Sequence, residues 1–134
     1  MSERPLVRVR DVMKTEFDLV DGMTTVADAL HNMKHLENKA FIVDKRHPDD
    51  EYGMLLISDI ARKVLAKDRA PERVNVYEVM VKPVIDVEPD MDIRYCARLF
   101  ERFELTRAPV VESRKVVGIV SFTDLVMRGP YGKL

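Results

Sequence analysis

Two rhythms of hydrophobic and polar positions run along this chain, and each rhythm occurs twice. The first rhythm places apolar residues at i, i+3, i+4 and i+7, which predicts a helix with one buried face. It occurs at Val26, Ala29, Leu30 and Met33, and again at Ile93, Cys96, Ala97 and Phe100. Thr25 and Asp92 stand directly before these stretches, where a side-chain oxygen can cap the first free backbone amides.

The second rhythm consists of short runs rich in β-branched residues, which predict strands. Residues 17–20 and 84–87 precede the two helices, and a pair of further runs follows each helix. These pairs are residues 40–44 with 52–56, and residues 108–112 with 115–121. A second helical stretch closes each half, at residues 57–65 and 122–126. The predicted order is therefore β-α-β-β-α, twice, in an α+β chain.

The order repeats because the sequence itself repeats. The triplet Asp-Val-Met at 11–13 is answered by Glu-Val-Met at 78–80, 67 residues later. "AFIVD" at 40–44 matches "APVVE" at 108–112 once the register is shifted by one residue, and a polar insertion, "KRHPDDEY", fills 45–52. A two-copy period of this size predicts two half-domains that share a core. We place the first repeat at 1–66, a linker at 67–75 and the second repeat at 76–134.

Composition narrows the class of protein. Hydrophobic residues make up 46% and charged residues 34% of the 134 positions, which indicates a folded chain and argues against disorder. The formal net charge of −1 provides no electrostatic attraction for nucleic acid or an anionic membrane. No apolar run approaches the roughly 20 residues needed to span a bilayer, and no secretory signal is visible. The single cysteine, Cys96, cannot form an internal disulfide. We therefore expect a cytoplasmic protein.

The candidate chemistry lies in the phrase "GIVSFTDL" at 118–125, which has an echo, "GMLLISDI", at 53–60. Ser121 and Asp124 are predicted at the junction of a strand and a helix, so that a hydroxyl and a carboxylate face one cleft beside free amides. A carboxylate can accept both hydroxyls of a ribose, and hydroxyls can donate to a phosphate. The same residues could instead serve only as a helix cap and a first-turn acid.

Taken together, these motifs resemble the cystathionine-β-synthase (CBS) domain pair. The resemblance rests on "VM" before a short strand, on "APVV" and on "GIVSFTDL", and it covers about residues 9–127. It implies a pseudo-two-fold pair of β-α-β-β-α units packed sheet to sheet, with a cleft beside each copy. It also implies a regulatory module that binds adenosyl ligands without catalysing a reaction. Because the resemblance covers almost the whole chain, we expect a freestanding module.

The resemblance further implies roles for individual residues. Asp124 would hold the ribose, Ser121 the phosphate, and Thr123 would assist. The adenine would lie between backbone and apolar atoms of Val84, Ile85, Ala108 and Pro109. In the first repeat Asp59 and Ser58 would form at most a weaker second site, because Leu56 replaces the hydroxyl. The ligand would be AMP, ADP, ATP or S-adenosylmethionine, with no cofactor required.

Other motifs support plainer interpretations. His31 and His35 have the i, i+4 spacing of metal ligands, but a solvated helix face explains them better, so we expect no metal site. Cys96 falls on the apolar face, where a core thiol is expected. No combination of residues suggests a catalytic centre, so we expect no enzyme; a hydrolase or transferase acting on nucleotides is the weakest alternative.

A second apolar stripe on one helix predicts a partner. Tyr95, Leu99 and Phe103 follow at i, i+4 and i+8, beside the stripe that is predicted to face the core. We expect a homodimer through this stripe and a separate, unidentified protein that the module regulates. The alternative in a different class is a structural protein-interaction module whose clefts hold no nucleotide.

Overall fold

The computed structural model describes residues 6–132, and it has the mixed helix and strand content expected of an α+β chain. The chain forms two compact units. One comprises residues 17–84, and we call it the Asp59 unit. The other combines residues 6–16 with residues 85–132, and we call it the Asp124 unit.

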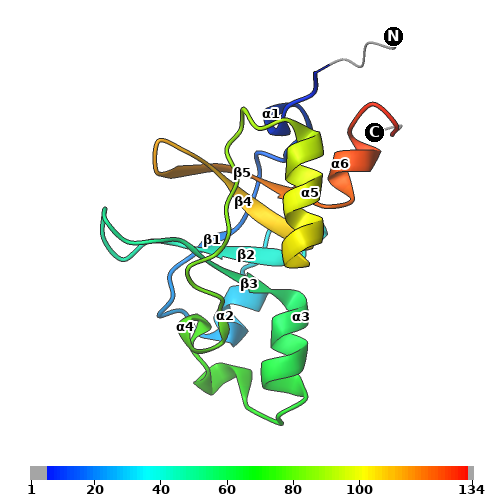
Figure 1. Ribbon diagram of the computed structural model, residues 1–134. Helices are drawn as coiled ribbons and strands as arrows, with labels where there is room; N and C mark the ends of the chain where they lie inside the picture. The colour runs from blue at the N-terminus through cyan, green and yellow to red at the C-terminus, as the bar shows by residue number, and fades with distance from the viewer. Residues whose placement is uncertain (1–5, 133–134) are drawn as a thin grey trace. The chain divides into compact units, whose positions relative to one another are not determined.

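The Asp59 unit has a three-stranded sheet in the order β1-β2-β3, in which β1 is parallel and β3 antiparallel to β2. Its strands are β1 (Leu19–Val20), β2 (Ala40–Val43) and β3 (Gly53–Leu56). Its helices are α2 (Val26–His31), α3 (Ile57–Ile60), which continues as a π-helical turn over Ala61–Leu65, and α4 (Val76–Val79). Short 3₁₀ turns lie at Leu36–Asn38 and Pro71–Arg73. In Figure 1 the three helices gather on one side of this sheet, where Phe41 and Leu55 are fully buried among them.

The Asp124 unit is built on one antiparallel strand pair, β4 (Arg107–Glu112) and β5 (Lys115–Ser121). Its helices are α1 (Val9–Val12), α5 (Ile93–Phe103) and α6 (Asp124–Met127). Figure 1 shows α5 lying across the strand pair with α6 beside it. The core between them contains Cys96, Phe100, Ala108 and Val120, each fully buried.

Each short helix that carries the Val-Met motif packs in the unit formed by the other half of the sequence. Val9 and Val12 of α1 are buried in the core of the Asp124 unit, and Val76 and Val79 of α4 in that of the Asp59 unit. The same backbone bonds hold both helices, since Val9 N–H donates to Met91 and Val76 N–H to Thr24. The compact units therefore differ from the halves of the sequence, and the boundaries at 66 and 76 stay a prediction about the repeat.

Both helix caps are confirmed. The Thr25 hydroxyl accepts a hydrogen bond from Asp28 N–H at 3.1 Å, and the Asp92 carboxylate accepts one from Arg94 N–H at 2.9 Å. The predicted strand over residues 84–87 is wrong in extent, because only Val87 forms a bridge, parallel to Val110. The helix predicted through Met33 ends at His31, and Leu30 is 40% exposed.

The early end of α2 also removes the helical spacing of the two histidines. The Asp18 carboxylate accepts hydrogen bonds from the N–H groups of Lys34 and His35, both at 2.9 Å, and so holds the chain after the helix in another conformation. Within residues 6–132, no group of three or more His, Cys, Asp or Glu is placed to hold a metal ion. No helix in the same range is long and apolar enough to cross a membrane.

The register of the repeat needs a correction. Ala40 pairs with Leu56 at the end of the first strand pair, and Arg107 pairs with Ser121 at the same point of the second. Ala40 therefore corresponds to Arg107, and the one-residue shift that aligned Ala40 with Ala108 is wrong. The shift maximised identity in a run of similar apolar residues, whereas the strand pairing keeps the 67-residue offset.

Candidate functional site

The turn from β5 into α6 brings Ser121, Thr123 and Asp124 together. The Asp124 N–H donates a hydrogen bond to Ser121 Oγ at 3.0 Å, so Ser121 does serve as a cap for the start of the helix. Ser121 Oγ and Thr123 Oγ1 lie 3.1 Å apart, which places both hydroxyls on one side of the turn. A hydroxyl that accepts one hydrogen bond can still donate another, so capping does not exhaust the capacity of Ser121.

The Asp124 side chain is buried but has no hydrogen-bond donor among the residues that the structure describes. The residue is 8% exposed, and its nearest cationic group is Lys14 Nζ, 3.9 Å from Oδ2. That distance exceeds a hydrogen bond, so both carboxylate oxygens can still accept one. Among the described residues no fully buried side-chain oxygen lacks a hydrogen-bond partner, so the Asp124 oxygens keep contact with solvent, from which a ligand could reach them.

A second cation stands next to the same turn. Arg107 is the strand partner of Ser121. Burial lowers the pKa of the Arg107 guanidinium, and the nearby Asp124 carboxylate acts in the opposite direction. Lys14 and Arg107 thus both lie near a hydroxyl pair and a carboxylate, which suits an anionic group bound beside a diol.

Sequence reasoning missed both cations. Lys14 lies about a hundred positions before the turn, and it reaches the turn because its backbone forms an antiparallel bridge with Ile119 of β5. Gly118 permits this approach, since a Cβ there would lie 2.7 Å from the Lys14 carbonyl oxygen. A signal existed in the repeat, because both copies of the phrase begin with glycine, and Gly53 makes the same approach to Val81.

The predicted adenine contacts are only partly accessible. Ala108 is fully buried in the core of the unit, backbone included. Pro109 is buried too, and its carbonyl accepts a hydrogen bond from Val87 N–H at 3.0 Å. Ile85 is 36% exposed. Val84 belongs to the Asp59 unit, where its N–H donates to Tyr52 at 3.2 Å, so its role in the cleft stays a prediction.

The corresponding turn in the Asp59 unit is already satisfied by the protein itself. Asp59 is 4% exposed, and its Oδ2 accepts a hydrogen bond from Leu56 N–H at 3.1 Å. Its Oδ1 accepts another from Arg62 Nη2 at 2.8 Å. Ser58 is exposed, and Val81 occupies the position that Lys14 has in the other unit. This turn therefore offers neither a free carboxylate nor a second cation.

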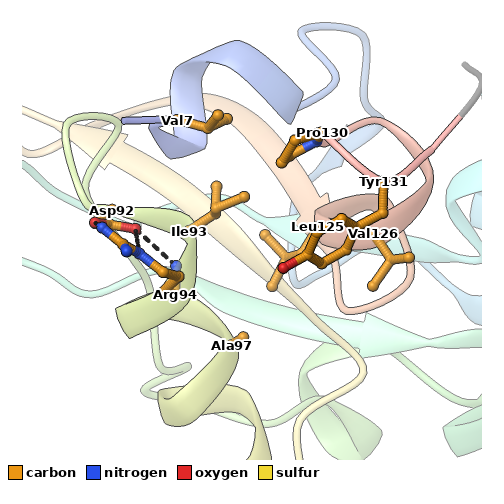
Figure 2. Close-up of a pocket in the computed structure, with 9 residues that line it drawn as sticks. All are labelled: Val7, Asp92, Ile93, Arg94, Ala97, Leu125, Val126, Pro130 and Tyr131. Carbon is orange, nitrogen blue, oxygen red and sulfur yellow. Dashed lines mark hydrogen bonds and ion pairs between the residues drawn. The ribbon is translucent and has the colours of Figure 1, made fainter. Parts of the chain in front are cut away.

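A separate pocket of about 320 Å³ lies in the Asp124 unit between the start of α5 and α6, and Figure 2 shows its lining. Its walls are mostly aliphatic, and Tyr131 borders it from the chain that follows α6. The only ion pair drawn there joins Asp92 to Arg94 at 2.7 Å, and this contact lowers the pKa of Asp92 to about 2. The lining of this pocket is therefore mainly an apolar surface, without a cluster of reactive side chains.

Comparisons with known proteins agree with this architecture. The CBS-domain family model matches residues 76–130. A hexameric CBS-CP12 protein from bloom-forming cyanobacteria is 34% identical and superimposes with a TM-score of 0.89, over 94% of this chain and 70% of the other. The chain belongs to the CBS-domain family. The resemblance found in the sequence and the α+β fold are thereby confirmed.

Two further proteins are similar to this chain. The uncharacterized protein MK0525 of Methanopyrus kandleri is 29% identical over 85% of this chain, and the chain spans 59% of its length. The CBS domain pair of protein MJ0100, solved in complex with 5′-methylthioadenosine and S-adenosyl-L-methionine, has a TM-score of 0.77. It is 22% identical, over 90% of this chain and 94% of that one, so it shares the fold alone.

Proposed function

We propose that this CBS-domain protein is a non-catalytic regulatory module that binds an adenosyl ligand beside Asp124. The observation that carries the proposal is the contrast between two buried carboxylates. Asp59 accepts two hydrogen bonds from its own unit, whereas Asp124 accepts none from the described residues. A ligand with two vicinal hydroxyls would supply the missing donors.

The surrounding groups suit the remainder of a nucleotide. Ser121 and Thr123 share one hydrogen bond, so the pair would donate its remaining hydroxyl proton to a phosphate that Lys14 and Arg107 neutralise. The binding of adenosyl compounds by the MJ0100 domain pair, which has the same fold, supports this class of ligand. AMP, ADP and ATP fit the cations better than S-adenosylmethionine, whose sulfonium would lie near them. Backbone and apolar atoms of Ile85, Ala108, Pro109 and Val84 would hold the adenine.

The ligand would act as a signal rather than as a substrate. CBS-domain proteins are in general regulatory, and the polar groups around Asp124 include no nucleophile next to a base. The response would pass to a regulated protein that this chain does not identify. We keep the homodimer through α5 and the cytoplasmic location as predictions.

A structural interaction module is the second candidate, and the helical surface of the Asp124 unit favours it. Tyr95 is 62% and Phe103 50% exposed on α5. Such a surface suits a protein partner whether or not a nucleotide binds. The two candidates differ in whether purified protein responds to adenosyl compounds.

Thermal shift with AMP, ADP, ATP, S-adenosylmethionine and NADH tests the proposal first, and calorimetry then counts sites. We expect one strong site per chain. Asp124→Ala should lower the affinity for AMP about ten- to a hundredfold, because hydrogen bonds to a charged group contribute about 1.5–3 kcal/mol. Asp59→Ala is the matched control and should retain wild-type affinity. Two equivalent sites, or equal losses in both variants, would contradict the assignment, and no response to any compound would favour the interaction module.

A further inference from the structure

The Asp59 unit contains a pocket of about 460 Å³ far from Asp59 along the sheet. It lies where β1 and β2 end and α4 begins, and it includes Val43, which pairs with Gly53 at the start of β3. Asp59 follows the opposite end of β3, beyond Leu56. The pocket is therefore distinct from the turn that corresponds to the proposed nucleotide site.

The two units differ in the side chains at this place. Arg10 N–H donates to Pro89 at 2.9 Å, and Tyr77 N–H donates to Gly22 at 2.9 Å, so Tyr77 stands in its unit where Arg10 stands in the other. In the Asp124 unit the Arg10 guanidinium lies 2.7 Å from Asp90 and 3.3 Å from Glu112.

No such ion pair forms in the Asp59 unit. The residue at the position of Asp90 is Met23, and Met23 and Tyr77 both line the pocket. They are 67% and 49% exposed, respectively. Where the other unit has an arginine–aspartate pair, this pocket has an aromatic ring and a thioether in its lining.

Two carboxylates stand side by side at the mouth of this hollow. Val20 pairs with Val43 in the parallel pair, and Asp21 and Asp44 are the next residues of the two strands. Asp21 accepts one hydrogen bond, from Met23 N–H, and Asp44 accepts one from Lys45 N–H, both at 2.8 Å. No described side chain neutralises either carboxylate, so each can accept a cationic donor.

Arg46, which belongs to the polar insertion at 45–52, also lines this pocket. The insertion is folded around Asp50, whose carboxylate accepts hydrogen bonds from Lys82 Nζ at 2.6 Å and from Arg46 N–H at 2.9 Å. Lys82 is thereby occupied. The Arg46 side chain lines the pocket and has no hydrogen-bond or ion-pair partner among the described residues.

From this arrangement we propose that the pocket binds a zwitterionic α-amino acid with an apolar side chain. Its ammonium group would lie between Asp21 and Asp44, within reach of the Tyr77 ring for a cation–π contact. Its carboxylate would pair with the Arg46 guanidinium. Its side chain would rest on Val43 and Met80, which form the apolar part of the lining.

The chemistry argues against other ligands. A phosphate would face two carboxylates, which repel it. A bare divalent cation would leave the guanidinium and the apolar lining without a role. A pocket volume of about 300–1,000 Å³ is typical for small molecules, and this pocket falls within that range.

Titration calorimetry of the full chain with L-leucine, L-methionine and L-phenylalanine tests the proposal without any nucleotide. At least one of them should bind, and its N-acetyl and amide derivatives, which each lack one charge, should bind at least tenfold more weakly. Asp44→Asn and Arg46→Gln should each lower affinity about tenfold or more. Glu88→Gln, at the position in the other repeat that matches Asp21, is the control and should bind as the wild type does.

A closing variant provides an independent test. Tyr77→Arg combined with Met23→Asp rebuilds the ion pair of the other unit and should abolish amino-acid binding while circular dichroism stays native. If none of the three amino acids binds at millimolar concentration, or if the blocked derivatives bind equally well, the proposal is wrong. Asp124→Ala should leave this binding unchanged, so failure here and failure of the nucleotide site are distinguishable.

Discussion

Arg62 Nη2 lies 2.8 Å from Oδ1 of Asp59, one turn further along the same helical stretch. The equivalent position after Asp124 is Met127, which carries no charge. One repeat thus supplies a hydrogen-bonding guanidinium to its carboxylate from the same helical stretch, whereas in the other the nearest cationic group, Lys14 Nζ, lies 3.9 Å away. The two copies therefore differ in the residue three positions after the aspartate, Arg62 or Met127, as well as in the exchange of Ser121 for Leu56.

Substitutions at Met127 and Arg62 test the role of this position in each repeat. Met127→Arg should offer Asp124 an internal guanidinium and weaken AMP binding about tenfold, measured by calorimetry. Arg62→Met should cost up to about 1 kcal/mol of unfolding free energy in urea, because the pair is exposed on the arginine side. Unchanged AMP affinity in Met127→Arg would contradict a free carboxylate at Asp124.

Ser121→Ala should affect stability and binding separately. Loss of the hydrogen bond from Asp124 N–H should cost about 1 kcal/mol, as for other helix caps. Affinity for AMP and ATP should fall more than affinity for adenosine, because only a phosphate would use the hydroxyl. Ser58→Ala, at the exposed position of the other repeat, should change neither quantity; equal losses for adenosine and AMP would argue against a phosphate contact.

Gly118→Ala should destabilise the protein by about 1–3 kcal/mol, as overpacking commonly does. Its Cβ would approach the Lys14 carbonyl oxygen to 2.7 Å, and a backbone atom cannot move aside easily. Gly22→Ala is the control, since its Cβ would meet Tyr77 at an ordinary 3.4 Å. Urea denaturation of the two variants decides this, and similar midpoints would show that the close approach is dispensable.

The apolar stripe on α5 should support a homodimer. Leu99 packs partly against the core, so the informative change is Tyr95→Glu with Phe103→Glu, which alters exposed residues only. Light scattering should show a monomer with native circular dichroism. Leu36→Glu with Leu65→Glu, at positions 71% and 77% exposed, should leave the assembly unchanged. If the wild-type protein is already monomeric at high concentration, the prediction of a homodimer is wrong.

Cys96 should be inert in the folded protein and should make stability fall at high pH. Burial raises the pKa of its thiol from 9.0 to about 11. The neutral thiol is favoured in the fold, so this contribution is complete below about pH 9 and is lost as pH rises through about 11. Iodoacetamide at pH 8 should label Cys96 only in urea, and rapid labelling of native protein would contradict its burial.

Much of the fold could be predicted because it depends on local periodicity. The caps at Thr25 and Asp92, the face of α5 around Phe100 and the two strand pairs all follow from patterns a few residues long. The strand predicted at 84–87 was wrong because a strand requires continuous pairing with a neighbouring strand, and only Val87 of these residues forms a β-bridge.

The candidate site was predictable only in part. Ser121, Thr123 and Asp124 are close in sequence, so a single turn brings them together. Lys14 and Arg107 come from other segments, and β-bridges between distant residues carry them to that turn. The residues around Ser121 and Asp124 in the sequence do not indicate which distant segments pair with this turn.

The sequence by itself determined the repeated β-α-β-β-α order, the CBS resemblance and the divergence of the two Ser/Leu-x-x-Asp turns, because each is written in neighbouring residues. Tertiary structure alone decided which Val-Met helix joins which unit and which cations stand beside Asp124. It also decided that Arg62 pairs with Asp59 and that Tyr77 lines a pocket at the position where Arg10 pairs with Asp90 in the other unit. The physical reason is that charge pairing and close packing act over a few ångströms in space, whatever the separation along the chain.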